Sequence, residues 1–147
     1  MDKILVCAPQ HSSKAYCFDQ WALNTLCFTH NNYDVFLADN SDTPEFSKKF
    51  AHYGFNYTWQ NPQGKSTLQK MADSHNACRA YAIDNNYDYM LHLETDVIPK
   101  ANIIEQLIAS RRKVVCANYR LFQGAGSELC SRDFAHHIKS FLAVYAI

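Results

Sequence analysis

Several short apolar runs that do not alternate with polar residues constrain the fold of this chain most strongly. The runs ILVCA, VFLA and VVCA are continuously apolar, whereas a strand with one solvated face alternates between apolar and polar residues. Continuous apolar character is typical of strands that are covered on both faces, as in a parallel sheet. The sequence therefore predicts buried strands, which we place at residues 3–8, 34–38, 55–59, 89–93 and 114–118.

Helical patterns lie between several of these strands. Ser12 and Ser13 are good N-cap residues for a helix that runs to about residue 29. One face of this helix carries mainly apolar side chains, namely Phe18, Trp21, Ala22 and Leu26. A second helix is predicted from residue 67 to about residue 85, with an apolar stripe made of Leu68, Met71, Cys78 and Ala82. A third is expected to start at Pro99, because proline fits the first turn of a helix.

The alternation of strands and helices predicts an α/β domain with a mainly parallel sheet. Sheets of this kind bind their ligands at the carboxyl ends of the strands. Polar clusters follow three of the predicted strands, and these are Pro9-Gln10-His11, Asp39-Asn40-Ser41 and Glu94-Thr95-Asp96. Their common location predicts a ligand site at one edge of the sheet.

The composition argues against several other classes of protein. With 147 residues, of which 48% are hydrophobic, the chain suits one domain with one core. Lys plus Arg and Asp plus Glu both number 14, whereas a nucleic-acid binder usually carries a basic excess. No stretch approaches the ~18 to 20 apolar residues of a membrane span, and the first apolar run is too short for a signal peptide. We therefore expect a soluble, cytoplasmic protein.

The six cysteines do not form a metal-binding pattern. None belongs to a CxxC pair, so a zinc site has no support in the sequence. Cys7 and Cys116 lie inside apolar runs and are expected to be small buried hydrophobic residues. We expect the chain to be reduced and intracellular.

Four segments, taken in order, resemble the nucleotide-sugar-binding half of a GT-A-fold glycosyltransferase, nearest to family 2. They are KILVCAPQ, VFLADNSD, HNACRAYAIDNNYDYMLHLETDVIP and KVVCANYR, and the resemblance covers roughly residues 3–120. It implies a three-layer α/β/α fold of the nucleotide-diphospho-sugar transferase type in a single domain. Residues 1–120 would bind the nucleotide-sugar, and residues 121–147 would form an incomplete acceptor-side part. The implied activity is transfer of a sugar from a UDP- or GDP-linked donor to an unidentified acceptor.

The resemblance also implies roles for individual residues. Asp96 matches the last Asp of the DxD motif, which contacts a divalent cation, Mn²⁺ or Mg²⁺, that bridges the diphosphate. Glu94 takes the first position of this DxD-like motif, as a metal or nucleotide-sugar ligand. Asp39 matches an acidic residue that contacts the base or the ribose. The other residues implied to bind the nucleotide-sugar are Ala8, Pro9, Gln10 and Asn76.

The chemistry of a nucleotide-sugar gives a separate reason for two carboxylates after a buried strand. The anomeric bond breaks only if the departing diphosphate is stabilised. A divalent cation does this as a Lewis acid, held by one or two carboxylates together with phosphate oxygens and water. The same cation offsets the repulsion between Glu94 and Asp96. The alternative is that both acids belong to a turn before the helix at Pro99, where the helix dipole favours negative charge.

Simpler interpretations of the other candidate residues stay open. Asp39 can belong to a turn, Asn76 can form a hydrogen bond with the backbone of its own helix, and His75 can be a surface residue. The adjacent His136 and His137 do not share a helical face, so solvated histidines are favoured there over a metal site.

Three hypotheses about function remain at this stage. The first is a metal-dependent glycosyltransferase. The second is a non-catalytic or remnant GT-A domain that binds a nucleotide-sugar without turnover, because neither Glu128 nor Asp133 lies in a motif of a catalytic base. The third is an unrelated α/β binding or regulatory domain. A P-loop is not supported, because no Gly stands five residues before Gly64. The sequence leaves an oligomer open.

Overall fold

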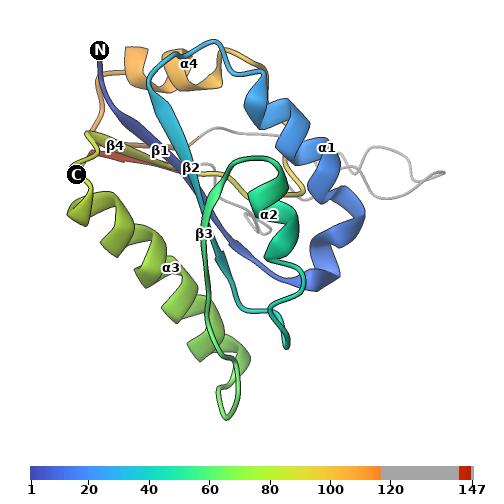
Figure 1. The fold of residues 1–147 in the computed structure, drawn as a ribbon. Helices are drawn as coiled ribbons and strands as arrows, with labels where there is room; N and C mark the ends of the chain where they lie inside the picture. Colours follow the sequence, from blue (N-terminus) through green and yellow to red (C-terminus); the bar gives the residue numbers. More distant parts are fainter. Residues whose placement is uncertain (117–142, 147) are drawn as a thin grey trace, which may run out of the picture.

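The computed structural model of the protein, which describes residues 1–116 and 143–146, contains one sheet between two layers of helices (Figure 1). Its strands are ordered β3-β2-β1-β4-β6-β5. The four strands that run parallel are β1 (Ile4–Gln10), β2 (Tyr33–Asp39), β3 (Asn56–Trp59) and β4 (Tyr89–His92). The strand β6 (Ala143–Ala146) is antiparallel both to β4 and to β5 (Val114–Cys116). The predicted α/β fold with a mainly parallel sheet is confirmed.

The helices cover both faces of the sheet. One face packs against α1 (Ala15–Leu26), α2 (Lys48–His52) and α4 (Ile103–Ala109), and the other packs against α3 (Thr67–Asp84) (Figure 1). Residues 4–8 of β1 alternate between these two cores, and none of them is more than 1% exposed. The prediction of strands that are covered on both faces is therefore confirmed for the runs ILVCA in β1 and VFLA in β2. It is wrong for the run VVCA, because β5 is an edge strand and Val114 is 56% exposed.

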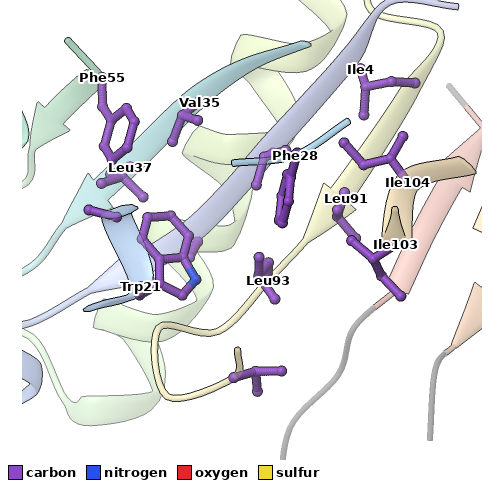
Figure 2. Packing of buried hydrophobic residues seen from close by; sticks show 14 of the residues in the cluster. Ile4, Trp21, Phe28, Val35, Leu37, Phe55, Leu91, Leu93, Ile103 and Ile104 are labelled. Atoms are coloured by element: carbon purple, nitrogen blue, oxygen red, sulfur yellow. The ribbon is translucent and has the colours of Figure 1, made fainter. Parts of the chain in front are cut away.

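The core under α1 and α4 is the larger of the two and is rich in aromatic rings (Figure 2). Trp21 of α1 is fully buried, and its ring meets the ring of Phe55 edge to face at 6.0 Å between centroids. Leu93, directly after β4, packs in the same cluster and is also fully buried. This packing anchors the segment that follows β4 to the core beneath α1.

Two helix starts that the sequence predicts are wrong. The two expected capping serines lie in a short 3₁₀ helix (Ser12–Lys14), and the cap is His11, whose Nδ1 accepts a hydrogen bond from the backbone N–H of Ser13 at 3.1 Å. Pro99 does not begin α4. Its carbonyl oxygen accepts a hydrogen bond from Nδ2 of Asn24 at 3.2 Å. This contact holds the segment against α1, and α4 begins only at Ile103.

The predicted apolar stripes are partly wrong as well. Leu26 is 50% exposed, and the buried position belongs to Thr25, because a rotation of 100° per residue puts position 25 in line with Phe18. Leu68 and Met71 are 79% and 49% exposed. They lie in the first turns of α3, which extend past the ends of the strands and have no sheet to pack against (Figure 1).

The cysteine predictions have mixed outcomes. Cys7 is fully buried, as expected. Cys116 is exposed, because it ends the edge strand β5. In the described part of the chain, every cysteine is a free thiol. Several predicted features lie outside the described residues: the end of the last strand at Asn118, the acids Glu128 and Asp133, and the pair His136 and His137. Among the helices that the structure describes, none combines the length and apolar character needed to cross a membrane.

Candidate functional site

The carboxyl ends of β1, β2 and β4 carry the three predicted polar clusters, and the structure brings these clusters to one edge of the sheet. Gln10 lies opposite Asp39 in the pairing of β1 with β2. Just beyond the strands, the backbone N–H of Ser12 donates to Oγ of Ser41 at 2.8 Å. The loop after β4 joins this group through a side-chain contact of Asp96 with the turn after β1.

These ends meet where the strand order reverses. From β1 the chain moves outward through β2 and β3, and it then returns to the other side of β1 with β4. The connecting helices α1 and α2 consequently lie on one face and α3 on the other (Figure 1). In parallel α/β sheets such a reversal leaves a crevice beyond the carboxyl ends of the two central strands, and ligands bind there. Here the two strands are β1 and β4.

Asp39 organises the turn after β2. Its carboxylate is fully buried. Oδ1 accepts hydrogen bonds from the backbone N–H of Ser41 at 2.9 Å and from its hydroxyl at 2.5 Å, while Oδ2 accepts from the hydroxyl of Ser47 at 2.5 Å. Both oxygens are therefore engaged within the protein in this conformation. The predicted contact of Asp39 with a base or a ribose stays a prediction.

A second polar group connects the turn after β2 to α3. Nδ2 of Asn40 donates to Oγ of Ser74 at 3.0 Å, and Oγ of Ser74 lies 3.0 Å from Oε1 of Gln60. Ser74 was not predicted as a site residue. It could have been found in the sequence, because it continues the buried stripe of Cys78 and Ala82 at four-residue steps. The group holds the beginning of α3 beside the strand ends.

Glu94 belongs to a group of side chains on the α3 face of the sheet. Nε2 of His92 lies 3.1 Å from Oε1 of Glu94, and the ring of His92 stacks on the ring of His75 with centroids 4.6 Å apart. Desolvation lowers the pKa of His75, the charge of His92 lowers it further, and Glu94 acts in the opposite direction. The lowered pKa disfavours a positive charge on His75 beside Glu94.

Asp96 does receive a positive charge, from Lys14. Nζ of Lys14 forms an ion pair with Oδ2 of Asp96, and the two side chains are 33% and 35% exposed. Partial burial by itself would lower the pKa of Lys14, but the hydrogen bond and the charge of Asp96 outweigh it, and the pKa is raised. No motif marks Lys14 in the sequence, because only the pairing of β1 with β4 brings together two residues that are 82 positions apart.

The other predicted residues occupy different environments along this edge. Ala8 is fully buried in β1, Pro9 is half-buried, and Asn76 is exposed on α3. Gln10 and Thr95 are each 1% exposed, and within the described residues their side-chain polar atoms have no hydrogen-bond partner. Buried polar atoms without partners are costly and mark places where water or a ligand is accommodated.

The carboxylates of Glu94 and Asp96 are suitable ligands for the divalent cation that the resemblance implies. The side chains of Glu94 and Asp96 are 28% and 35% exposed, and carboxylate oxygens are the ligands that Mg²⁺ and Mn²⁺ prefer. Across residues 1–116 and 143–146, no three His, Cys, Asp or Glu side chains converge into a metal-binding group. A cation here would thus be held by one or two carboxylates and would take its remaining ligands from a bound molecule and from water.

A concavity that is separate from this edge lies at the other end of the sheet. It has a volume of about 420 Å³ and is lined by Tyr89, Ile108, Arg111, Arg112 and other residues at the amino ends of the strands. None of the predicted site residues lines it. A shallow hollow at the carboxyl edge is lined in part by Asn40 and Gln60. The site at the carboxyl edge therefore rests on convergent polar groups and not on cavity size.

Comparison with solved structures shows that the fold is GT-A-like. S. aureus TarS, in its 1–349 form and in complex with UDP, matches with a TM-score of 0.60 and 13% identity over 98% of this chain and 46% of that chain. CMP:2-keto-3-deoxy-manno-octonic acid synthetase complexed with CTP matches with a TM-score of 0.52 and 11% identity over 74% of this chain and 46% of that chain.

A Desulfovibrio desulfuricans protein described as a nucleotide-diphospho-sugar transferase gives a third match. Its TM-score is 0.52 at 12% identity, over 79% of this chain and 57% of that chain. This chain spans about half the length of each of the three structures. No protein-family model matches the sequence, and a search of curated proteins found no match. The comparisons therefore show the fold, which the sequence resemblance predicted.

Proposed function

We propose that this domain binds a nucleoside-diphosphate sugar at the carboxyl edge of its sheet and transfers the sugar to an acceptor. The observation that carries the proposal is that Gln10, Asp39 and Asp96 lie at neighbouring strand ends on one edge of the sheet, where the strand order reverses. The matched structures add support, because TarS was crystallised with UDP and the synthetase with CTP. UDP- and GDP-linked sugars are the two donor classes that we propose to test.

The residues of this edge have different proposed roles in binding. Asp39 holds the turn after β2 in shape through Ser41 and Ser47. Gln10 supplies a buried amide that has both a donor and an acceptor to offer to a base or a ribose. Asp96, with Glu94 two residues before it, presents carboxylate oxygens beside the position where we place the diphosphate. A cation bound there, Mn²⁺ or Mg²⁺, would stabilise the departing diphosphate as a Lewis acid.

The proposal is tested by calorimetric titration of UDP and GDP into the wild-type protein, each with and without Mn²⁺. We expect one of the two to bind with a Kd on the order of micromolar when Mn²⁺ is present, and more weakly without it. Adenosine monophosphate serves as the control, because it has neither the diphosphate nor a pyrimidine or guanine base. If a folded protein binds neither diphosphate under any condition, the proposal is wrong.

A second assay separates transfer from binding alone. Release of UDP or GDP from the corresponding nucleotide-sugar, measured over hours, reports turnover even without the acceptor, because water can replace it. Metal-dependent release supports the transferase. Tight binding without release supports the alternative function, a GT-A domain that binds a nucleotide-sugar without turnover.

A further inference from the structure

The loop that follows β4 and carries Glu94 and Asp96, here called the acidic loop, already has a counter-ion within the protein. Lys14 pairs with Asp96 across the edge between β1 and β4, so this carboxylate is neutralised without a bound cation. Within the described residues, the other basic side chain that pairs with an acid of this loop is that of His92, next to Glu94. Lys65 and Lys70, at the start of α3, are paired with Asp73 at 2.7 Å and with Asp42 at 3.7 Å.

A divalent cation that binds Oδ2 of Asp96 competes with this lysine for the same oxygen. Two cations on one carboxylate oxygen repel each other, which favours release of the lysine. The displaced ammonium group stands on a flexible four-carbon stem and keeps three hydrogen-bond donors. A diphosphate bound to the cation at Asp96 would be an anion within reach of the displaced ammonium group.

We propose that Lys14 is a phosphate-binding residue that acts as an exchangeable counter-ion, holding Asp96 in the empty site and passing to the diphosphate when a cation takes its place. The proposal rests on the function proposed above and adds a residue that no motif in the sequence assigns. It has two consequences of opposite sign. Lys14 competes with the cation for Asp96 in the empty protein, and it strengthens the binding of the nucleoside diphosphate.

The experiment compares wild type with Lys14→Met, which keeps the length of the side chain and removes its charge. UDP and GDP affinities are measured by calorimetry at saturating Mn²⁺, and Mn²⁺ affinity without nucleotide by electron paramagnetic resonance of the free ion. We expect Lys14→Met to bind the diphosphate about tenfold more weakly at saturating Mn²⁺, because a charged contact with the phosphate is lost. We expect it to bind Mn²⁺ alone up to about fivefold more tightly, because a partly exposed ion pair no longer competes.

Two further variants exclude a purely structural explanation. Lys49→Met removes another lysine that is paired with an aspartate, Asp19, at 3.2 Å on the outer side of α1 and α2, and it should leave both affinities unchanged. Lys14→Arg should restore most of the diphosphate binding, because it restores the charge. If Lys14→Met leaves both affinities at wild-type values, the proposal is overturned. If wild type binds neither nucleotide, the proposed function fails, while the Mn²⁺ titration still decides whether Lys14 competes for Asp96.

Discussion

Replacing Asp96 with alanine is expected to weaken the binding of UDP or GDP in the presence of Mn²⁺ by about 100-fold, which corresponds to about 2.7 kcal/mol for the loss of a charged ligand. The cause is the loss of the carboxylate that we propose to hold the cation. Without Mn²⁺ we do not expect the variant to lose affinity for the diphosphate. The same variant should bind the diphosphate at least as well as wild type, because Lys14 is released from its ion pair. Calorimetry under both conditions measures the two effects.

Asp19→Ala is the matched control for this experiment. Asp19 also forms an ion pair with a lysine, Lys49, but this pair joins α1 to α2 and involves none of the predicted site residues. Its replacement should leave nucleotide affinity unchanged with and without Mn²⁺. Asp96→Ala should also stay folded, with a Tm within a few degrees of wild type, because a partly exposed ion pair contributes about 1 kcal/mol or less. An Asp96→Ala protein that retains wild-type affinity in Mn²⁺ would show that the cation is not held there.

Replacing Asp39 with alanine is expected to lower the free energy of unfolding by about 3 kcal/mol and the Tm by about 10 °C. The carboxylate is fully buried, and it accepts three hydrogen bonds from Ser41 and Ser47. Alanine would leave two hydroxyl groups and a backbone N–H without their acceptor. Chemical denaturation followed by circular dichroism measures the change.

Two variants calibrate this second prediction. Asp39→Asn keeps one oxygen acceptor and the volume of the side chain, so it should cost about 1 kcal/mol. Asp42→Ala lies on the same turn, but the side chain of Asp42 is 82% exposed, and stability should change by less than about 0.5 kcal/mol. If Asp39→Ala is as stable as Asp42→Ala, the carboxylate does not organise the turn. A loss of nucleotide binding in Asp39→Asn, at nearly full stability, would then favour the predicted direct contact with the base or the ribose.

The sequence predicted the fold because its strands carry a strong signal of their own. Runs such as ILVCA are apolar without alternation, and burial on both faces is the only state that satisfies such a strand. All five predicted strands are present in the structure, and the polar clusters after three of them lie at one edge. The resemblance of four ordered segments added the GT-A type, even though the matched structures share no more than 13% identity with this chain.

The errors have local causes. Leu68 and Met71 follow the helical period of α3 but lie where the sheet has ended, so their periodicity does not lead to burial. Pro99 is compatible with a helix start, yet its carbonyl oxygen accepts a hydrogen bond from the side chain of Asn24 in α1. The antiparallel strand β6 inserts between β4 and β5, a pairing that local patterns do not encode.

Only part of the candidate site could be predicted from the sequence, because some of its residues meet only in the folded chain. Residues at strand ends can be found by position, and Gln10, Asp39 and Asp96 were found in that way. Lys14, Ser74 and His92 contribute through contacts between different segments of the chain, with Asp96, Asn40 and His75 respectively. Single lysines, serines and histidines occur on most surfaces, and only the order of the strands shows which of them meet at the crevice.

The central claim, that the ligand site lies at the carboxyl edge between β1 and β4, is tested most directly by nuclear magnetic resonance of the ¹⁵N-labelled protein. UDP or GDP is added with Mg²⁺, which does not broaden the signals. We predict that the largest changes in amide chemical shift occur at Gln10, Asn40 and Asp96, and that Arg111 and Lys113, which line the concavity at the opposite end of the sheet, do not change. Changes concentrated at Arg111 and Lys113, with none at the carboxyl edge, would contradict the claim.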